Sequence, residues 1–95
     1  MRAVVLQGHR SVSVENVPDA TLLGPDSAII AVDRTAICGS DLHLYHGEIG
    51  SQGIQLGHEF VGHVVETGPH VRRIKKGDRV VVSAVIGCGR CAACL

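Results

Sequence analysis

Aromatic residues are nearly absent from this sequence of 95 residues, which has no tryptophan, one tyrosine (Tyr45) and one phenylalanine (Phe60). Proteins that bind nucleic acid by stacking need several aromatic side chains on one surface, so this mode of binding is excluded. Net charge is absent too, because nine basic residues balance nine acidic ones. Without a basic field, we expect neither nucleic acid nor an anionic membrane surface as a partner.

Long apolar runs are also missing. No stretch approaches the roughly 20 apolar residues that a membrane-spanning helix needs, and the apolar part of residues 1–7 is too short for a secretory signal. We therefore expect a cytoplasmic protein with no membrane partner. The cytosol keeps thiols reduced, so metal binding or catalysis is favoured over disulfides for the four cysteines, Cys38, Cys88, Cys91 and Cys94.

Aliphatic side chains, by contrast, are abundant. Apolar residues make up 45% of the chain, and most are the valine, isoleucine, leucine and alanine of a small core. Segments with strand character are residues 2–7, 11–17, 27–37, 60–67 and 79–86, of which the last is the strongest. With about six strands and almost no helix, the pattern predicts a single mainly β domain over residues 1–95, built as a partly open antiparallel β-barrel.

One short helical turn is predicted directly after Cys38, over residues 40–45. Ser40 and His43 are three residues apart and therefore share a face of that turn, where they can touch. Gly62 interrupts a predicted strand and indicates a bulge or a close approach of another segment. A glycine-rich loop is predicted between these two elements, at Gly47, Gly50 and Gly53.

Cys38 and His58 provide a sulfur and a nitrogen ligand from two different segments. This mixture suits Zn²⁺ in a catalytic site, where three protein ligands leave one position open. Glu59 is the nearest candidate for the third ligand, and the alternative is a residue that the chain does not contain. Asp41 suits the role of a carboxylate that accepts the free ring N–H of a ligating histidine.

Ser40 and His43 suit a proton path. A hydroxyl group can pass one proton on while accepting another, and an imidazole titrates near neutral pH. Near the end of the sequence, two successive C-x-x-C steps hold Cys88, Cys91 and Cys94. This cluster indicates a metal site more than a redox thiol cluster, which is the alternative.

Taken together, four motifs resemble the zinc-dependent alcohol dehydrogenases of the medium-chain dehydrogenase family. The motifs are Cys38-Gly39-Ser40-Asp41-Leu42-His43, then Gly57-His58-Glu59 with Gly62, Gly68 and Val71, then Gly77-Asp78-Arg79-Val80, and finally the cysteine cluster. The resemblance covers nearly the whole chain and implies a GroES-like catalytic domain. The pairing of Gly39 with Ser40 is similar to the branch that handles polyols, threonine and formaldehyde-type substrates.

The resemblance also implies roles for individual residues. Cys38 and His58 would bind the catalytic zinc, with Glu59 behind it. Ser40 would contact the substrate alcohol, and His43 would be the distal relay near the ribose of NAD or NADP. The structural zinc would be bound by Cys88, Cys91 and Cys94.

Enzymes of that family have roughly 350 residues in two domains. We therefore expect an N-terminal fragment of the catalytic domain, with the dinucleotide-binding domain absent, from a parent enzyme that acts on a small alcohol or aldehyde. Two alternatives stay open: a catalytically inactive GroES-like fragment, which could form homo-oligomers through exposed apolar surface, and a zinc-binding or interaction module. With two or three ligands at each site, we expect weak or absent zinc binding by the fragment.

Overall fold

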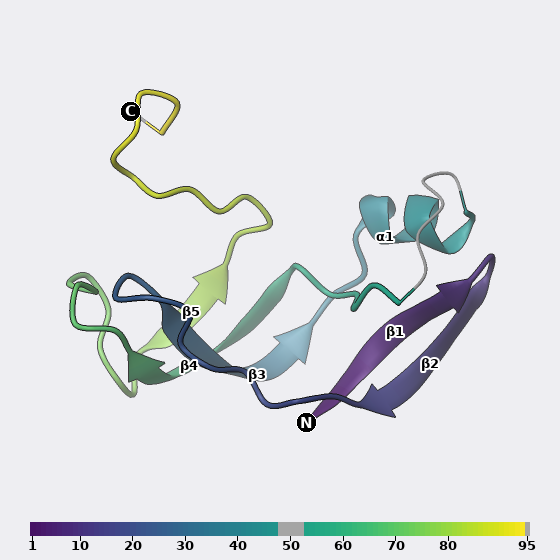
Figure 1. The fold of residues 1–95 in the computed structure, drawn as a ribbon, viewed down its shortest axis with the longest axis horizontal. Coiled ribbons are helices and arrows are strands. Elements are labelled where there is room, and N and C mark those ends of the chain that lie inside the picture. The colour runs from purple at the N-terminus through teal and green to yellow at the C-terminus, as the bar shows by residue number, and fades with distance from the viewer. Residues whose placement is uncertain (48–52, 95) are drawn as a thin grey trace.

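The computed structural model of the chain describes residues 1–47 and 53–94. Gly50, part of the predicted glycine-rich loop, lies outside these residues. The elements, in chain order, are β1 (Arg2–Gly8), β2 (Ser11–Asn16), β3 (Ala28–Thr35), α1 (Gly39–Tyr45), β4 (Phe60–Thr67) and β5 (Arg79–Val82). The prediction of a mainly β fold with one short helix after Cys38 is therefore confirmed (Figure 1).

The strands form two antiparallel sheets that stay open in the described part of the chain. One is the β1–β2 hairpin, and the other has the order β3-β4-β5. Both lie side by side in Figure 1, with α1 beyond the end of β3 and next to the hairpin. The helix has seven residues, and no helix in the described ranges is long and apolar enough to cross a membrane.

The core is small, as expected for so short a chain. Its most deeply buried apolar side chains are Leu6 and Val64, each 1% exposed. Gly62 pairs with Val32 across β3 and β4, and a Cβ atom at this position would overlap the carbonyl oxygen of Ala31. The predicted close approach at Gly62 is confirmed, and it lets the two strands pack without a side chain between them.

Two strand predictions were too long. The strand predicted over residues 79–86 ends at Val82, and Val85 and Ile86 beyond it are 83% and 86% exposed. β5 is an edge strand bonded to β4 alone, so residues 83–86 after it lack a partner strand in the described part of the chain. Likewise β3 ends at Thr35, and Ile37 is 80% exposed. Strand propensity is realised only where a neighbouring strand accepts the backbone hydrogen bonds.

Candidate functional site

Cys38 lies in the short connection between β3 and α1, directly before the helix. It is the N-cap residue of the helix, with extended backbone angles (φ −94°, ψ 157°). The backbone N–H of Cys38 donates a hydrogen bond of 3.0 Å to Asp41 Oδ2. This bond from the N-cap to the third helical residue satisfies one of the free backbone groups at the helix start. It also restrains the backbone of Cys38 at the start of the helix.

The segment that carries His58 is held against β1. Leu6 N–H donates to the Ile54 carbonyl at 2.9 Å, and Leu56 N–H donates to the Val4 carbonyl at 2.8 Å. Gly57 then has a φ of +108°, a backbone region that favours glycine. The chain turns at this residue, and His58 and Glu59 follow directly before β4.

Three predicted ligands come together at this point. One ligand atom each of Cys38, His58 and Glu59 lies within 4.8 Å of the other two, and all three side chains are half-buried. A sulfur, a ring nitrogen and a carboxylate oxygen form a donor set that Zn²⁺ accepts at a catalytic site with one open position. The residues present therefore fit the metal.

Asp41 lies behind His58. Its side chain is buried, and Oδ1 lies 3.4 Å from His58 Nδ1. No aligned hydrogen bond reaches this buried oxygen in the described part of the chain, although an unpartnered buried carboxylate oxygen is costly. A proton on His58 Nδ1 would face this oxygen and leave Nε2 as the lone-pair nitrogen, which is the tautomer a ligating histidine needs.

Ser40 and His43 are placed differently from each other. The hydroxyl of Ser40 lies 3.2 Å from His58 Nε2, so it shares the edge of the imidazole that would bind a metal. His43 lies one helical turn later on α1, with an exposed side chain. The contact of the Ser40 hydroxyl with His58 was not predicted from the sequence, and the predicted contact with His43 stays a prediction.

Electrostatics favour the charged forms of Cys38 and His58. Hydrogen bonds from Ser40, and then from His58, lower the pKa of the Cys38 thiol, while partial desolvation and the charge of Glu59 oppose this effect. The hydrogen bond with Cys38 raises the pKa of His58, partial desolvation opposes this effect, and the negative charges of Asp41, Cys38 and Glu59 add to the rise. A thiolate is the form of cysteine that binds metals.

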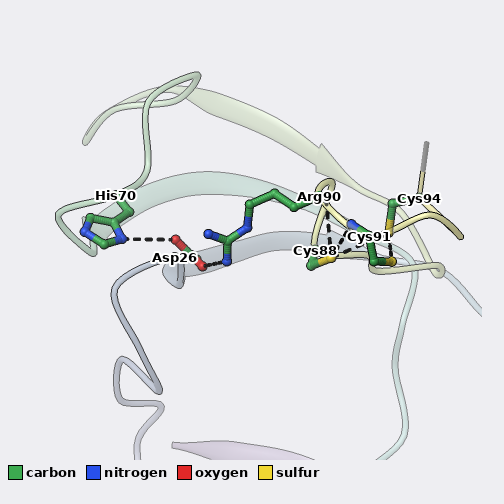
Figure 2. Close-up of polar contacts among 6 residues, drawn as sticks. All are labelled: Asp26, His70, Cys88, Arg90, Cys91 and Cys94. Atoms are coloured by element: carbon green, nitrogen blue, oxygen red, sulfur yellow. Dashed lines mark hydrogen bonds and ion pairs between the residues drawn. The ribbon is translucent and has the colours of Figure 1, made fainter.

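A second cluster lies in the C-terminal segment (Figure 2). Cys94 Sγ is 3.9 Å from Cys88 Sγ and 3.5 Å from Cys91 Sγ. A tetrahedral zinc site with Zn–S bonds of about 2.3 Å places its sulfur atoms about 3.8 Å apart. The three thiols, which are exposed and not in disulfides, therefore fit three corners of such a site. Within residues 1–47 and 53–94, the cluster has these three members and no fourth.

Backbone N–H groups point at the first sulfur of this cluster. The amides of Arg90 and Cys91 each donate to Cys88 Sγ at 3.4 Å. These hydrogen bonds, with that of Arg90 the strongest, lower the pKa of the Cys88 thiol to about 7. Near neutral pH, the thiol and the thiolate of Cys88 are therefore both populated.

An apolar cavity of about 370 Å³ lies next to α1. Its lining includes Leu42 and Tyr45 of the helix and Val4 and Val12 of the hairpin, together with Asp41. Cys38 and His58 do not line it. The cavity lies between the helix and the hairpin, and it adjoins the candidate ligand set through Ile37 and Gly57, the residues directly before Cys38 and His58.

Three residues at these sites were missed in the sequence. The hydroxyl of Thr35 bonds the Glu59 carbonyl, and Asp26 pairs with Arg90. A threonine in a strand is common, and Asp26 and Arg90 are 64 positions apart, so neither pair leaves a local signal. Only the position of Arg90 between two cysteines could have drawn attention to it.

Comparisons with known proteins agree with this geometry. The family model for the alcohol dehydrogenase GroES-like domain matches residues 24–95. A protein of Mycobacterium tuberculosis named as a probable zinc-binding alcohol dehydrogenase is 53% identical over 95 residues, which cover 99% of this chain and 25% of the relative. The chain thus spans about a quarter of that relative's length.

Solved structures agree as well. An alcohol dehydrogenase from Thermus sp. ATN1 is 45% identical with a TM-score of 0.93, over 99% of this chain and 28% of that chain. A protein of Sinorhizobium meliloti 1021, solved bound to NADP, is 45% identical with a TM-score of 0.75, over 98% of this chain and 27% of that chain. With residues 24–95 matched by the family model, the chain belongs to the alcohol dehydrogenase GroES-like domain family.

Proposed function

We propose that the protein is a zinc-dependent alcohol:NAD(P) oxidoreductase, to which this chain contributes ligands of a catalytic zinc and a proton path. The observation that carries the proposal is the convergence of ligand atoms from Cys38, His58 and Glu59 within 4.8 Å of one another. Membership of the alcohol dehydrogenase GroES-like family and the zinc-type relative support it. The NADP-bound neighbour supports a nicotinamide cofactor.

Zinc, when bound, supplies a Lewis acid that polarises the alcohol oxygen, and the nicotinamide supplies the hydride acceptor. Cys38 and His58 hold the metal, and Asp41 orients His58 through Nδ1. Glu59 lies beside them and completes the donor set. The ligand carboxylate and thiolate balance the charge of the metal.

Ser40 is the first group of the proton path. Its hydroxyl lies 3.2 Å from His58 Nε2, and it becomes available to the alcohol proton once that nitrogen serves as a ligand. His43, one turn further along α1 and exposed, then passes the proton on, a task that suits an imidazole because it can both accept and release a proton.

The cysteine cluster takes a structural zinc, because Cys88, Cys91 and Cys94 are exposed and distant in sequence from the ligand set. The proposal places the protein in the cytoplasm, where its four free cysteines stay reduced. A small alcohol or aldehyde is the substrate class, and subunit association is expected through exposed apolar side chains, among them Leu23 and Val81.

The test uses protein expressed from the complete gene. Reduction of NAD or NADP in the presence of a panel of primary alcohols, polyols and threonine is followed by absorbance. Cys38→Ala and His58→Ala should each lower kcat/KM at least about 100-fold, because each removes a metal ligand. The control His63→Ala removes an exposed histidine of β4 that faces Asp33 and should leave turnover unchanged. Full activity in either ligand variant would contradict the proposal.

The alternative of a zinc-binding module without enzymatic activity is favoured by the second cluster alone, since three exposed thiols can bind zinc without any catalysis. The same experiment separates the two. Stoichiometric zinc together with no turnover on any alcohol of the panel would select the binding module. Zinc-dependent turnover selects the oxidoreductase.

A further inference from the structure

The segment that holds the cysteine cluster runs away from the sheet after β5 (Figure 1). Within the residues described, one hydrogen-bonded ion pair links residues 84–94 to the earlier part of the chain. Arg90 Nη2 donates to Asp26 Oδ2 at 2.7 Å (Figure 2). The position of the cluster therefore depends on this contact.

The Asp26 end of the contact is well anchored. Asp26 lies just before β3, in a turn that packs against the end of β4. Gly68 N–H donates to the Ser27 carbonyl at 2.8 Å, and His70 N–H donates to the Pro25 carbonyl at 2.9 Å. His70 Nδ1 also lies 3.6 Å from Asp26 Oδ1. The segment just before β3 is thus held against the segment just after β4, and His70 faces the Asp26 carboxylate.

The Arg90 end of the contact lies inside the cluster. Arg90 stands between Cys88 and Cys91 in the sequence, and its backbone N–H donates to Cys88 Sγ at 3.4 Å. A side chain held by Asp26 therefore restrains the same residue whose amide faces the first sulfur. Groups that hold a metal's ligands in place contribute to metal affinity without touching the metal.

We propose that Asp26 is a positioning residue for zinc in the cysteine cluster: through the guanidinium of Arg90 it holds Cys88, Cys91 and Cys94 in their ligand arrangement and slows zinc loss. This inference rests on the structural zinc of the proposed function. Arg90 and Asp26 are 73% and 53% exposed at their side chains, so the pairing is screened by salt. Its effect is therefore modest and salt-dependent.

The experiment measures the rate of zinc release to a chromogenic chelator from protein expressed from the complete gene. All variants carry Cys38→Ser, which removes a ligand from the other candidate site, so the signal comes from the cysteine cluster. At low salt, Asp26→Asn and Arg90→Gln should each release zinc about two- to fivefold faster than the parent. The double variant should be no faster than either single one, because both changes break one contact. In about 1 M sodium chloride the differences should vanish.

The matched control is Asp33→Asn, which alters another exposed aspartate that lies 3.4 Å from a histidine, His63, and should release zinc at the parental rate. Equal release by the parent and Asp26→Asn at low salt would overturn the proposal. An additive double variant, or a difference that persists in high salt, would overturn it too, since either indicates a role unrelated to the ion pair.

A failure of the underlying zinc assignment is recognised separately. In the same background, Cys88→Ser should abolish zinc binding by elemental analysis. If zinc content stays unchanged, the cysteine cluster holds no zinc and the proposed function loses its structural site. Circular dichroism of each variant distinguishes local loss of metal from unfolding.

Discussion

The hydroxyl of Thr35 donates a hydrogen bond of 3.1 Å to the backbone carbonyl oxygen of Glu59. The same oxygen accepts a second hydrogen bond, of 3.0 Å, from the amide of Ala36. Cys38 follows only three residues after Thr35. The end of β3 therefore positions both parts of the candidate ligand set. The Cys38 thiol follows β3 in the chain, and the two hydrogen bonds to the Glu59 carbonyl hold the backbone of the His58–Glu59 pair beside it.

Replacing Thr35 with valine tests this arrangement. Valine keeps the shape and the strand propensity of threonine, and the Glu59 carbonyl keeps its bond to Ala36, so the free energy of unfolding should fall by only about 1 kcal/mol. Zinc affinity at the Cys38–His58 site should fall about 10-fold, because a residue that orients ligands has been lost. Urea unfolding and zinc competition with a chelator measure the two effects.

Thr67→Val at the end of β4 is the control, since it makes the same chemical change in the same sheet at a distance from the ligands. It should leave zinc affinity unchanged. If Thr35→Val binds zinc like the parent, the hydroxyl of Thr35 does not position the site.

At Gly62 the backbone of β3 lies close against β4. In Gly62→Ala, the new methyl group would overlap the Ala31 carbonyl oxygen and lie 2.8 Å from Ile30 Cγ2. Backbone atoms of a central pairing cannot move aside, so we expect a loss of about 3 kcal/mol in the free energy of unfolding. Thermal and denaturant unfolding measure this loss.

The control is Gly24→Ala, where the added methyl group meets nothing within 4 Å. It should change the free energy of unfolding by less than about 0.5 kcal/mol. Equal stability of the two variants would disprove the packing argument.

Local patterns in the sequence were enough to predict the positions of the strands, apart from the ends of two of them, and the short helix. Alternating valines indicated β2, and the metal-binding residue types at Cys38, His58 and Glu59 indicated the donor set that the fold brings within 4.8 Å. The role of Gly62 was also predictable, because a glycine inside a strand pattern often marks a bulge or a close approach of another backbone segment. The zinc assignments themselves stay predictions.

Long-range contacts could not be predicted in the same way. The end of β5 at Val82 depends on which strand lies beside it, and valine propensity carries no information about that. The contact of Ser40 with His58 depends on the turn at Gly57 and on the hydrogen bonds that hold the Glu59 carbonyl at the end of β3. The pairing of Asp26 with Arg90 joins two exposed side chains far apart in sequence, whose identities alone do not specify a partner.

Alkylation of the metal-free protein should show an early titration at Cys88. Backbone N–H groups lower the pKa of this thiol to about 7, so its thiolate should be half-populated near that pH, and its rate of reaction with iodoacetamide should reach half its maximum there. An ordinary cysteine has a pKa of about 8.5 and would react half-maximally at a higher pH. Peptide-level mass spectrometry after a timed pulse, in the presence of EDTA, gives the rate at each pH.

The control for this titration is the same pulse in concentrated guanidinium chloride. Unfolding removes the hydrogen bonds from Arg90 and Cys91, and the midpoint at Cys88 should then rise to the ordinary value. A midpoint that is the same in folded and unfolded protein would show that these amides do not stabilise the thiolate.

Asp41→Asn tests how the fold prepares His58 for a metal. Asparagine keeps the size of the side chain and one oxygen for the Cys38 amide, but it loses the carboxylate that faces His58 Nδ1 at 3.4 Å. Without that acceptor the imidazole is no longer held with its lone pair on Nε2, so zinc affinity at the Cys38–His58 site should fall about 10- to 100-fold. Zinc in the cysteine cluster should be unaffected, which makes it an internal reference in a competition titration.

Asp33→Asn is a close match for this change, because Asp33 Oδ1 lies at the same distance, 3.4 Å, from the Nδ1 atom of His63. Among the described residues, His63 belongs to neither group of converging metal-ligand atoms, so its loss of a carboxylate partner should leave both metal affinities unchanged. If Asp41→Asn behaves like Asp33→Asn, the buried carboxylate serves the start of α1 alone. If only Asp41→Asn weakens metal binding, the N-terminal turn of the helix and the metal site depend on the same side chain, which explains why an aspartate is buried at this position.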